Sequence, residues 1–293
     1  MSKIYEAVRK TGGGALELAR LLPGDPPPLD LGREPIAEEI AKPADLSGQN
    51  GSYDSGSLVK QQPSFRSARV SLAKGVPLLP FDDPSSAAAD QYKIVRTKIV
   101  QHSLTPRVVL ISSAERGDGK SVSAVNIAGA LAVSPDTSAL LIDGDFRGAN
   151  LAVSLGLTAS PGLADVLTGE CDINDAIVRL EPLSNLYLMP TGNIHAHSAE
   201  LFASPLWRNA CEFMRRQFTY TVIDSPPVGA VADYDLLQAL CDGVILVVRP
   251  DHTRRALCMK AIKTVPKDKL IGVLLNGIED SFFGRGAGHY YGY

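Results

Sequence analysis

Short apolar runs recur along the chain after residue 100 and predict the buried strands of a sheet. The first run, Arg107–Ser113, is rich in β-branched residues, as a strand covered on both faces requires. Five further runs repeat the pattern: Ala139–Asp143, Leu186–Pro190, Thr219–Asp224, Gly243–Arg249 and Leu270–Asn276. Runs of this kind are typical of parallel strands, so the pattern predicts a mostly parallel central sheet.

Segments with a helical pattern lie between several of these strands. They are Ala87–His102, Lys120–Val133, Pro205–Gln217, Asp233–Leu240 and Thr253–Thr264. Strands that alternate with helices form an α/β domain in which helices cover both faces of the sheet. One such domain, over residues 86–276, accounts for the patterned part of the chain.

The first 85 residues differ in composition from the rest. They hold 10 of the 20 prolines and 9 of the 26 glycines. Such a stretch buries too little apolar surface to offset the entropy lost on ordering, so we predict a largely disordered arm over residues 1–85. Two short helices are possible within it, at Ile4–Arg9 and Ala15–Leu22. Residues 277–293 are rich in glycine and tyrosine, and we predict a flexible tail there.

Overall charge narrows the classes of protein that fit. A net charge of −3 and a pI near 6.0 argue against a protein that mainly grips the nucleic-acid backbone. No apolar run approaches the roughly 18–20 residues that a membrane-spanning helix needs. The N-terminal residues form no apolar signal segment either. The sequence therefore predicts a cytoplasmic protein with no membrane span and no nucleic-acid partner.

A phosphate-binding loop lies between the first strand and the helix that follows it. Residues 114–121, Ala-Glu-Arg-Gly-Asp-Gly-Lys-Ser, match a P-loop with alanine in place of its first glycine. Gly117 and Gly119 leave room for backbone N–H groups to turn toward phosphate oxygens. Lys120 can reach the β and γ phosphates of a nucleotide, and Ser121 can ligate Mg²⁺. The sequence therefore predicts a P-loop NTPase fold that uses ATP and Mg²⁺.

Aspartates follow two of the apolar strands. Asp143 and Asp145 come just after one strand, and Asp224 ends another. Each aspartate alone fits a turn or cap equally well. Ligands of open parallel sheets bind beyond the carboxyl ends of the strands, so the three aspartates and the P-loop are expected in one crevice. Phosphoryl transfer needs such anionic groups to hold the metal ion and to position the nucleophile.

The order of these motifs resembles that of the bacterial tyrosine autokinases of polysaccharide export. Ile-Asp-Gly-Asp-Phe-Arg at 142–147 is similar to the second Walker A-like motif of that family, and Val-Ile-Asp-Ser-Pro-Pro at 222–227 is similar to its Walker B strand. Gly288–Tyr293 resembles a short version of the family's tyrosine-rich tail. A helical segment at 90–96 is similar to its Glu-x-x-Arg-x-x-Arg oligomerisation motif, with Asp and Lys substituted.

This resemblance implies an ATP-dependent protein-tyrosine kinase that phosphorylates its own tail and regulates polysaccharide synthesis or export. It implies a homo-oligomer, with a ring among the candidate forms, and a membrane-embedded polysaccharide co-polymerase that activates the kinase and recruits it to the inner face of the membrane. It also makes Asp143 the base toward the tyrosine phenol and Asn276 an adenine contact. The candidate residues are Lys120, Asp143, Asp145 and Asp224 for catalysis, Gly117, Asp118, Gly119, Lys120, Ser121, Val122, Arg147 and Asn276 for the nucleotide, Ser121, Asp145 and Asp224 for Mg²⁺, Tyr290, Tyr291 and Tyr293 for phosphorylation, and Asp90, Lys93 and Arg96 for oligomer contacts.

Other functions stay open beside this one. The partition and septum-positioning ATPases are a related class that dimerises on a membrane or on DNA. That class carries a lysine early in its P-loop, where this chain has Glu115. A regulator with a decayed site is disfavoured because each catalytic residue type is present. His195 and His197 could belong to a metal site, but no third ligand is evident and a loop is favoured.

Overall fold

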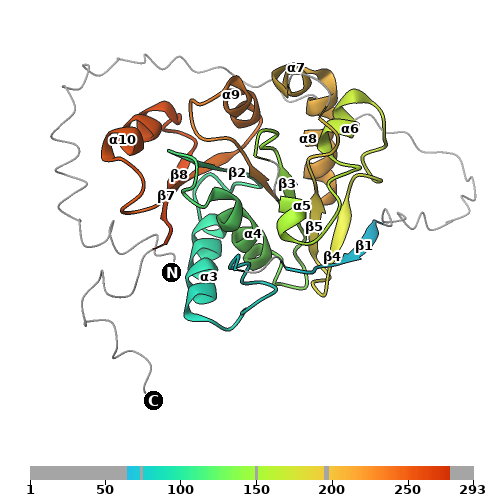
Figure 1. Cartoon of the computed structure of the whole chain (residues 1–293), viewed down its shortest axis with the longest axis horizontal. Coiled ribbons are helices and arrows are strands. Elements are labelled where there is room, and N and C mark those ends of the chain that lie inside the picture. The colour runs from blue at the N-terminus through green and yellow to red at the C-terminus, as the bar shows by residue number, and fades with distance from the viewer. Residues whose placement is uncertain (1–64, 73–74, 149–150, 195–197, 278–293) are drawn as a thin grey trace, which may run out of the picture. The chain divides into compact units, whose positions relative to one another are not determined.

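The computed structural model describes residues 65–72, 75–148, 151–194 and 198–277. An eight-stranded sheet runs through this part of the chain in the order β1-β4-β5-β3-β6-β2-β7-β8 (Figure 1). Neighbouring strands from β5 to β8 are all parallel, whereas β4 is antiparallel to β5 and parallel to β1. The strands are β1 (Arg66–Arg69), β2 (Val108–Ser113), β3 (Ala139–Asp143), β4 (Val178–Glu181), β5 (Leu186–Met189), β6 (Tyr220–Asp224), β7 (Gly243–Val248) and β8 (Leu270–Leu275).

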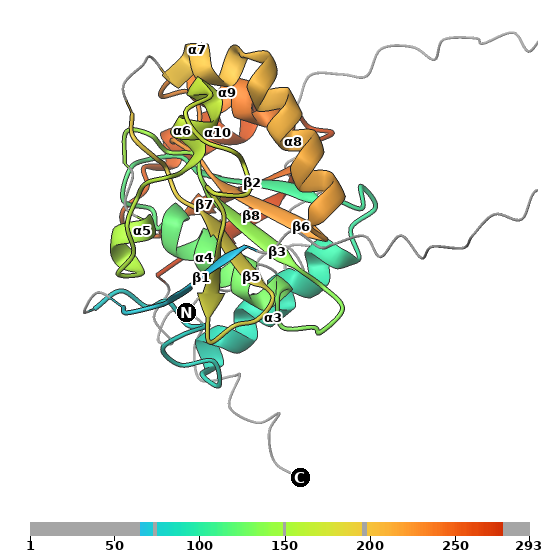
Figure 2. The same cartoon turned by 90° about the vertical axis from the view of Figure 1, so that its right-hand side faces the viewer.

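Helices cover both faces of this sheet, as Figures 1 and 2 show. On one face lie α3 (Ala87–Val100), α4 (Lys120–Leu131) and α5 (Leu151–Ser154). On the other lie α6 (Leu163–Thr168), α7 (Ser198–Ala203), α8 (Pro205–Gln217), α9 (Ala232–Ala239) and α10 (Arg255–Thr264). The predicted fold class, a mostly parallel sheet between two helical layers, is therefore confirmed.

A hydrophobic core lies on each face of the sheet, because successive side chains of a strand point to opposite faces. In β2, Val109 and Ile111 pack into the core beneath α3 and α4, while Val108 and Leu110 face the core beneath α8. All four side chains are almost completely buried. The only tryptophan, Trp207, belongs to the second core. Because both faces of the strand are apolar, β2 can lie only in the middle of a covered sheet.

A segment before α3 also packs onto the domain, which its composition did not indicate. Leu78 and Leu79 are buried in the core beneath α3 and α4. The Asn126 side chain on α4 accepts a hydrogen bond from the Leu79 N–H (2.9 Å) and donates one to the Pro77 carbonyl (3.1 Å). A Cβ at Gly129 would collide with Pro80. With β1, these residues place part of the range 1–85 in the domain.

The predicted strands and helices of residues 86–276 are confirmed to within two residues at their ends. The sequence pattern missed β1, β4 and the short helices α5 and α6. The two helical pieces considered for the arm, His195 and His197, and Tyr290, Tyr291 and Tyr293 all lie outside the described residues. Within the described part, no helix has both the length and the apolar character needed to cross a membrane.

Candidate active site

The P-loop connects β2 to α4 at the carboxyl end of the sheet. Gly117 and Gly119 have φ angles of +91° and +90°, a region that residues with a Cβ rarely adopt. A Cβ at Gly119 would also collide with the side-chain amide of Asn276. Helix α4 begins at Lys120, and no side chain caps its first N–H groups. These N–H groups can therefore serve an anion such as phosphate.

Lys120 lies among the aspartates that follow β3 and β6. Its Nζ is 2.6 Å from Asp145 Oδ2 and 3.7 Å from Asp224 Oδ1. Asp143 is the register partner of Asp224 across the β3–β6 pairing. The Lys120 ammonium is also 3.4 Å from the Ser121 hydroxyl. Strands β3 and β6 are adjacent, so the structure brings together the P-loop lysine and all three aspartates at one edge of the sheet.

Burial gives these groups unusual acid–base properties. Burial raises the pKa of Asp224 to about 7, helped by the charges of Asp143 and Asp145 and opposed by Lys120. Burial likewise raises the pKa of Asp143. For Lys120, burial acts to lower the pKa, but the charges of Asp224 and Asp145 outweigh it and the pKa rises. Lys120 is therefore protonated, and its single ammonium group is the only cation in the described part of the chain that these buried carboxylates share.

The site carries more negative charge than its lysine can balance. Three carboxylates against one ammonium leave a formal charge of −2 when all are ionised. Asp143 Oδ1 and Asp224 Oδ1 are buried and have no hydrogen-bond partner among the described residues. Hard divalent cations prefer such carboxylate and hydroxyl oxygens. The residues present therefore fit a Mg²⁺ ion held by Ser121, Asp145 and Asp224.

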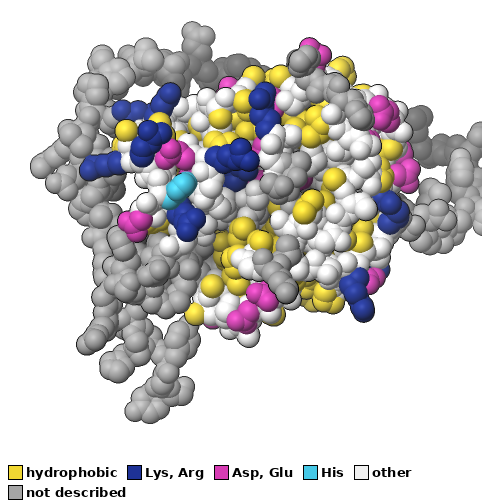
Figure 3. Space-filling model, in the orientation of Figure 1, with side chains coloured by type: hydrophobic (Ala, Val, Ile, Leu, Met, Phe, Trp, Pro, Cys, Tyr) yellow, Lys and Arg dark blue, Asp and Glu magenta, His cyan; other side chains and the backbone are white. Residues whose placement is uncertain are grey.

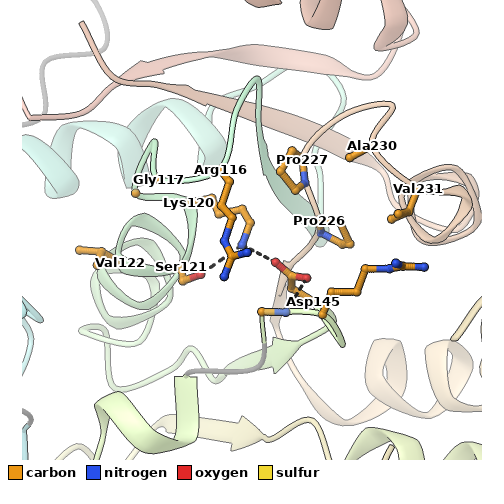
Figure 4. A pocket seen from close by; sticks show the side chains of 13 residues that line it. Arg116, Gly117, Lys120, Ser121, Val122, Asp145, Pro226, Pro227, Ala230 and Val231 are labelled. Atoms are coloured by element: carbon orange, nitrogen blue, oxygen red, sulfur yellow. Dashed lines mark hydrogen bonds and ion pairs between the residues drawn. The ribbon is translucent and has the colours of Figure 1, made fainter. Parts of the chain in front are cut away.

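A cavity of about 420 Å³ opens in front of Lys120, Ser121 and Asp145, whereas Asp143 and Asp224 are buried and do not line it. In Figure 4, Lys120, Ser121 and Asp145 face one another on one side, and Pro226 and Pro227 lie across from the P-loop. Its lining also includes Arg116, Gly117, Gly119, Val122, Arg147, Gly148, Ala230 and Val231. The volume lies within the range of about 300–1,000 Å³ that ligand pockets usually have. Gly117, Gly119, Ser121, Val122 and Arg147, predicted from sequence to contact the nucleotide, thus line one cavity with Lys120.

The back of the P-loop is held by contacts that the sequence did not predict. Asp118, completely buried, accepts hydrogen bonds from the Glu115 N–H (2.8 Å) and from the Thr253 hydroxyl (2.7 Å). The Asn276 amide donates to the Asp118 carbonyl (2.9 Å). The Glu115 carboxylate accepts from the backbone N–H (2.8 Å) and the guanidinium (3.1 Å) of Arg254.

We refer to this set, Glu115, Asp118, Thr253, Arg254 and Asn276, as the rear clamp. It ties the P-loop to β8 and to the start of α10. Asp118 was predicted to hold the triphosphate through its backbone and Asn276 to contact adenine. The structure places the Asp118 side chain against the Glu115 N–H and Thr253, and the Asn276 side chain against the Asp118 carbonyl. Glu115 binds Arg254 at the position where the alternative ATPase class carries its lysine.

The predicted oligomer contacts lie on the exposed part of α3, away from the cavity. Lys93 Nζ forms a 2.7 Å ion pair with Asp90 Oδ1 of the same helix, and both side chains are about half exposed (51% and 53%). Arg96 lies one turn further along and is partly exposed. These residues are thus accessible on one stretch of α3.

A P-loop NTPase is the class that this fold and site define. The sequence matches the AAA domain family over residues 106–267, more than half of the chain. It is 31% identical over 199 residues to the tyrosine-protein kinase YwqD of Bacillus subtilis, a match that covers 67% of this chain and 83% of YwqD. It is 30% identical over 211 residues to the succinoglycan biosynthesis transport protein ExoP of Rhizobium meliloti, covering 70% of this chain and 27% of ExoP.

The solved structures agree with these sequence matches. The BceF tyrosine kinase domain superposes with a TM-score of 0.61 and 27% sequence identity, covering 69% of this chain and 82% of that domain. The chain belongs to the family of bacterial tyrosine-protein kinases. The resemblance carried by the P-loop and the two aspartate motifs is therefore confirmed at the level of the family.

Proposed function

We propose that this chain is an ATP-dependent protein-tyrosine kinase that phosphorylates Tyr290, Tyr291 and Tyr293 of its own tail. The observation that carries the proposal is the surplus of negative charge around Lys120. A triphosphate alone would be repelled there, whereas the same charges bind Mg²⁺–ATP, because the cation neutralises both the aspartates and the phosphates. The names of relatives such as YwqD support tyrosine as the acceptor.

Each group has a part in the transfer that follows from its position. Lys120 would leave its ion pair with Asp145 for the phosphates and stabilise the charge that develops during transfer. Bound Mg²⁺ would supply further charge neutralisation to the phosphates. Asp143 is the proposed base: its Oδ2 accepts from the Leu151 N–H (3.2 Å), which leaves Oδ1 to take the phenol proton. Burial raises the pKa of Asp143, and a more basic carboxylate accepts this proton more readily.

Polysaccharide synthesis is the proposed setting. ExoP, named for succinoglycan biosynthesis and transport, contains a region similar to this chain within a much longer protein. We infer that a membrane-embedded co-polymerase activates this kinase and recruits it to the inner face of the cell membrane. Contacts through Asp90, Lys93 and Arg96 on α3 would join the kinase into a homo-oligomer, because all three are accessible and charged.

Mass spectrometry of the tail after incubation with Mg²⁺ and ATP tests the activity. We expect phosphotyrosine in the C-terminal peptide of the parent and none in Lys120→Met, which keeps most of the side-chain length but loses the charge. The variant with Phe at 290, 291 and 293 should lose most phosphotyrosine while it binds ADP as tightly as the parent. Unchanged tail labelling in Lys120→Met would refute the proposal.

A further inference from the structure

A strongly basic surface lies on α10 and the segment that leads into it, next to the rear clamp of the P-loop. We define the α10 surface by four residues, Arg249, Arg255, Lys260 and Lys263, all of which are exposed. None of the four has an ion-pair partner within the described part of the chain. In Figure 3, Lys and Arg side chains gather over α10.

The segment that contains the α10 surface is positively charged, although the chain as a whole is negatively charged. Residues 249–263 hold five Lys and Arg side chains and one Asp, a formal charge of +4, while the full chain carries −3. Helix α10 buries only Ala261, which packs against Leu246 and Val248 of β7. Cys258 and Ile262 pack partly against the same core, whereas the basic side chains are exposed and available to an anionic partner.

The C-terminal tail starts next to this surface. The Asn276 N–H donates to the Val248 carbonyl (2.9 Å), immediately before Arg249. A Cβ at Gly277 would lie 3.2 Å from the Arg249 Nε, so the last described residue touches the first residue of the α10 surface. Any tail that continues from Gly277 therefore begins within reach of the basic side chains.

We propose that the α10 surface is the docking site of this chain's own tail, residues 278–293, once its tyrosines carry phosphate. The inference rests on the proposed function, which supplies those phosphates. Before phosphorylation the tail holds Glu279 and Asp280 against Arg285, a formal charge of −1. Three phosphotyrosines add roughly −4.5 to −6. The tail then becomes strongly complementary in charge to the α10 surface.

The length of the tail suits this site. Tyr290 lies thirteen positions beyond Gly277, and a flexible chain of that length has a root-mean-square span of roughly 18–22 Å. Helix α10 has ten residues, which makes it about 15 Å long. A short tether also holds its end at an effective concentration of about the millimolar order, so contacts that are weak individually suffice. Docking of this kind keeps a phosphorylated tail out of the active-site cavity, so that a tail without phosphate can enter it.

A peptide-binding measurement tests the docking separately from the kinase activity. The receptor is the full chain with Phe at 290, 291 and 293, so its own tail bears no phosphate. The probe is a fluorescent synthetic peptide of residues 278–293 with three phosphotyrosines, titrated at low salt and followed by anisotropy. Arg255→Glu with Lys260→Glu alters the α10 surface. Arg69→Glu with Arg208→Glu is the matched control, because it changes the net charge by the same amount at exposed sites on β1 and α8.

We expect the phosphopeptide to bind at least about tenfold more tightly than its unphosphorylated form, and more weakly as salt is added. The α10 variant should lose about tenfold or more of this affinity, and the control should bind like the parent. Equal losses in both variants, or none in the α10 variant, would overturn the inference. A receptor that binds phosphatidylserine vesicles through Arg255 and Lys260 but does not bind the phosphopeptide would also overturn the inference, and would show that the α10 surface binds a membrane instead. Absence of tail phosphotyrosine after Mg²⁺–ATP would instead count against the proposed function.

Discussion

Thr253 provides a direct test of how the rear clamp holds the P-loop. The Thr253 hydroxyl donates to Asp118 Oδ1 (2.7 Å) and accepts from the Arg249 N–H (2.9 Å). Thr253→Val keeps the shape of the side chain but removes both hydrogen bonds. Asp118 is completely buried, so water cannot replace the lost donor without a local rearrangement.

The expected size of the effect follows from the charge of Asp118. A hydrogen bond to a charged group contributes about 1.5–3 kcal/mol. In a domain of this size each kcal/mol changes the melting temperature by about 2–4 °C, so Thr253→Val should melt about 3–12 °C below the parent. The P-loop can also move so that the Asp118 carboxylate finds another partner. In that case the same free energy appears as weaker binding of ATP or ADP, by at most about 10- to 150-fold.

Calorimetric titration with ADP and a thermal melt of the same protein measure both quantities. Thr253→Ser is the matched control, since it keeps the hydroxyl that bridges Asp118 and Arg249. We expect Thr253→Ser to stay near the parent in both measurements. A Thr253→Val protein that melts and binds ADP like the parent would show that the contact between Thr253 and Asp118 does not hold the loop.

Two further predictions concern stability. Burial raises the pKa of Asp224 from 3.8 to about 7, so the folded state binds more protons than the unfolded state between these pH values, and ionised Asp224 costs stability as the pH rises. Asp224→Asn should therefore raise the melting temperature without nucleotide, by an amount that grows from about pH 4 to about pH 7 and then stays constant. Extending an N-terminal deletion from residue 63 to residue 80 should lower the melting temperature, because it removes β1, Leu78 and Leu79; equal melting of the two shortened chains would contradict this.

The parts of the fold that the sequence predicted are those with a local signal. The buried strand β2 begins with four consecutive apolar residues, Val108 to Ile111, which cover both of its faces, and such a run is typical of a strand inside a covered sheet. The P-loop glycines and the aspartates at strand ends can likewise be recognised from short motifs of six to eight consecutive residues. Adjacent parallel strands then bring Asp143 beside Asp224 without any further information.

The parts that the sequence did not predict depend on distant contacts. Thr253 and Asp118 are separated by 135 positions, and neither residue type signals the other. Strand β1 is Arg-Ser-Ala-Arg, whose side chains are mostly exposed, so it is defined only by its pairing with β4. Leu78 and Leu79 are buried although they lie in a proline-containing stretch, and the next residue, Pro80, packs so closely on Gly129 that a Cβ there would collide with it.

The same electrostatics govern binding and stability at this site. Lys120 lies between Asp145 and Asp224, and Asp143 Oδ1 and Asp224 Oδ1 are buried with no hydrogen-bond partner among the residues that the structure describes. Buried polar atoms without partners cost free energy, so the folded chain is less stable than its packing alone would make it. On the proposed function, a divalent cation with a triphosphate would supply positive charge to the aspartates and phosphate oxygens to Lys120 in one event. Binding would then remove the unfavourable terms together, which would favour the complete Mg²⁺–ATP complex over either component alone.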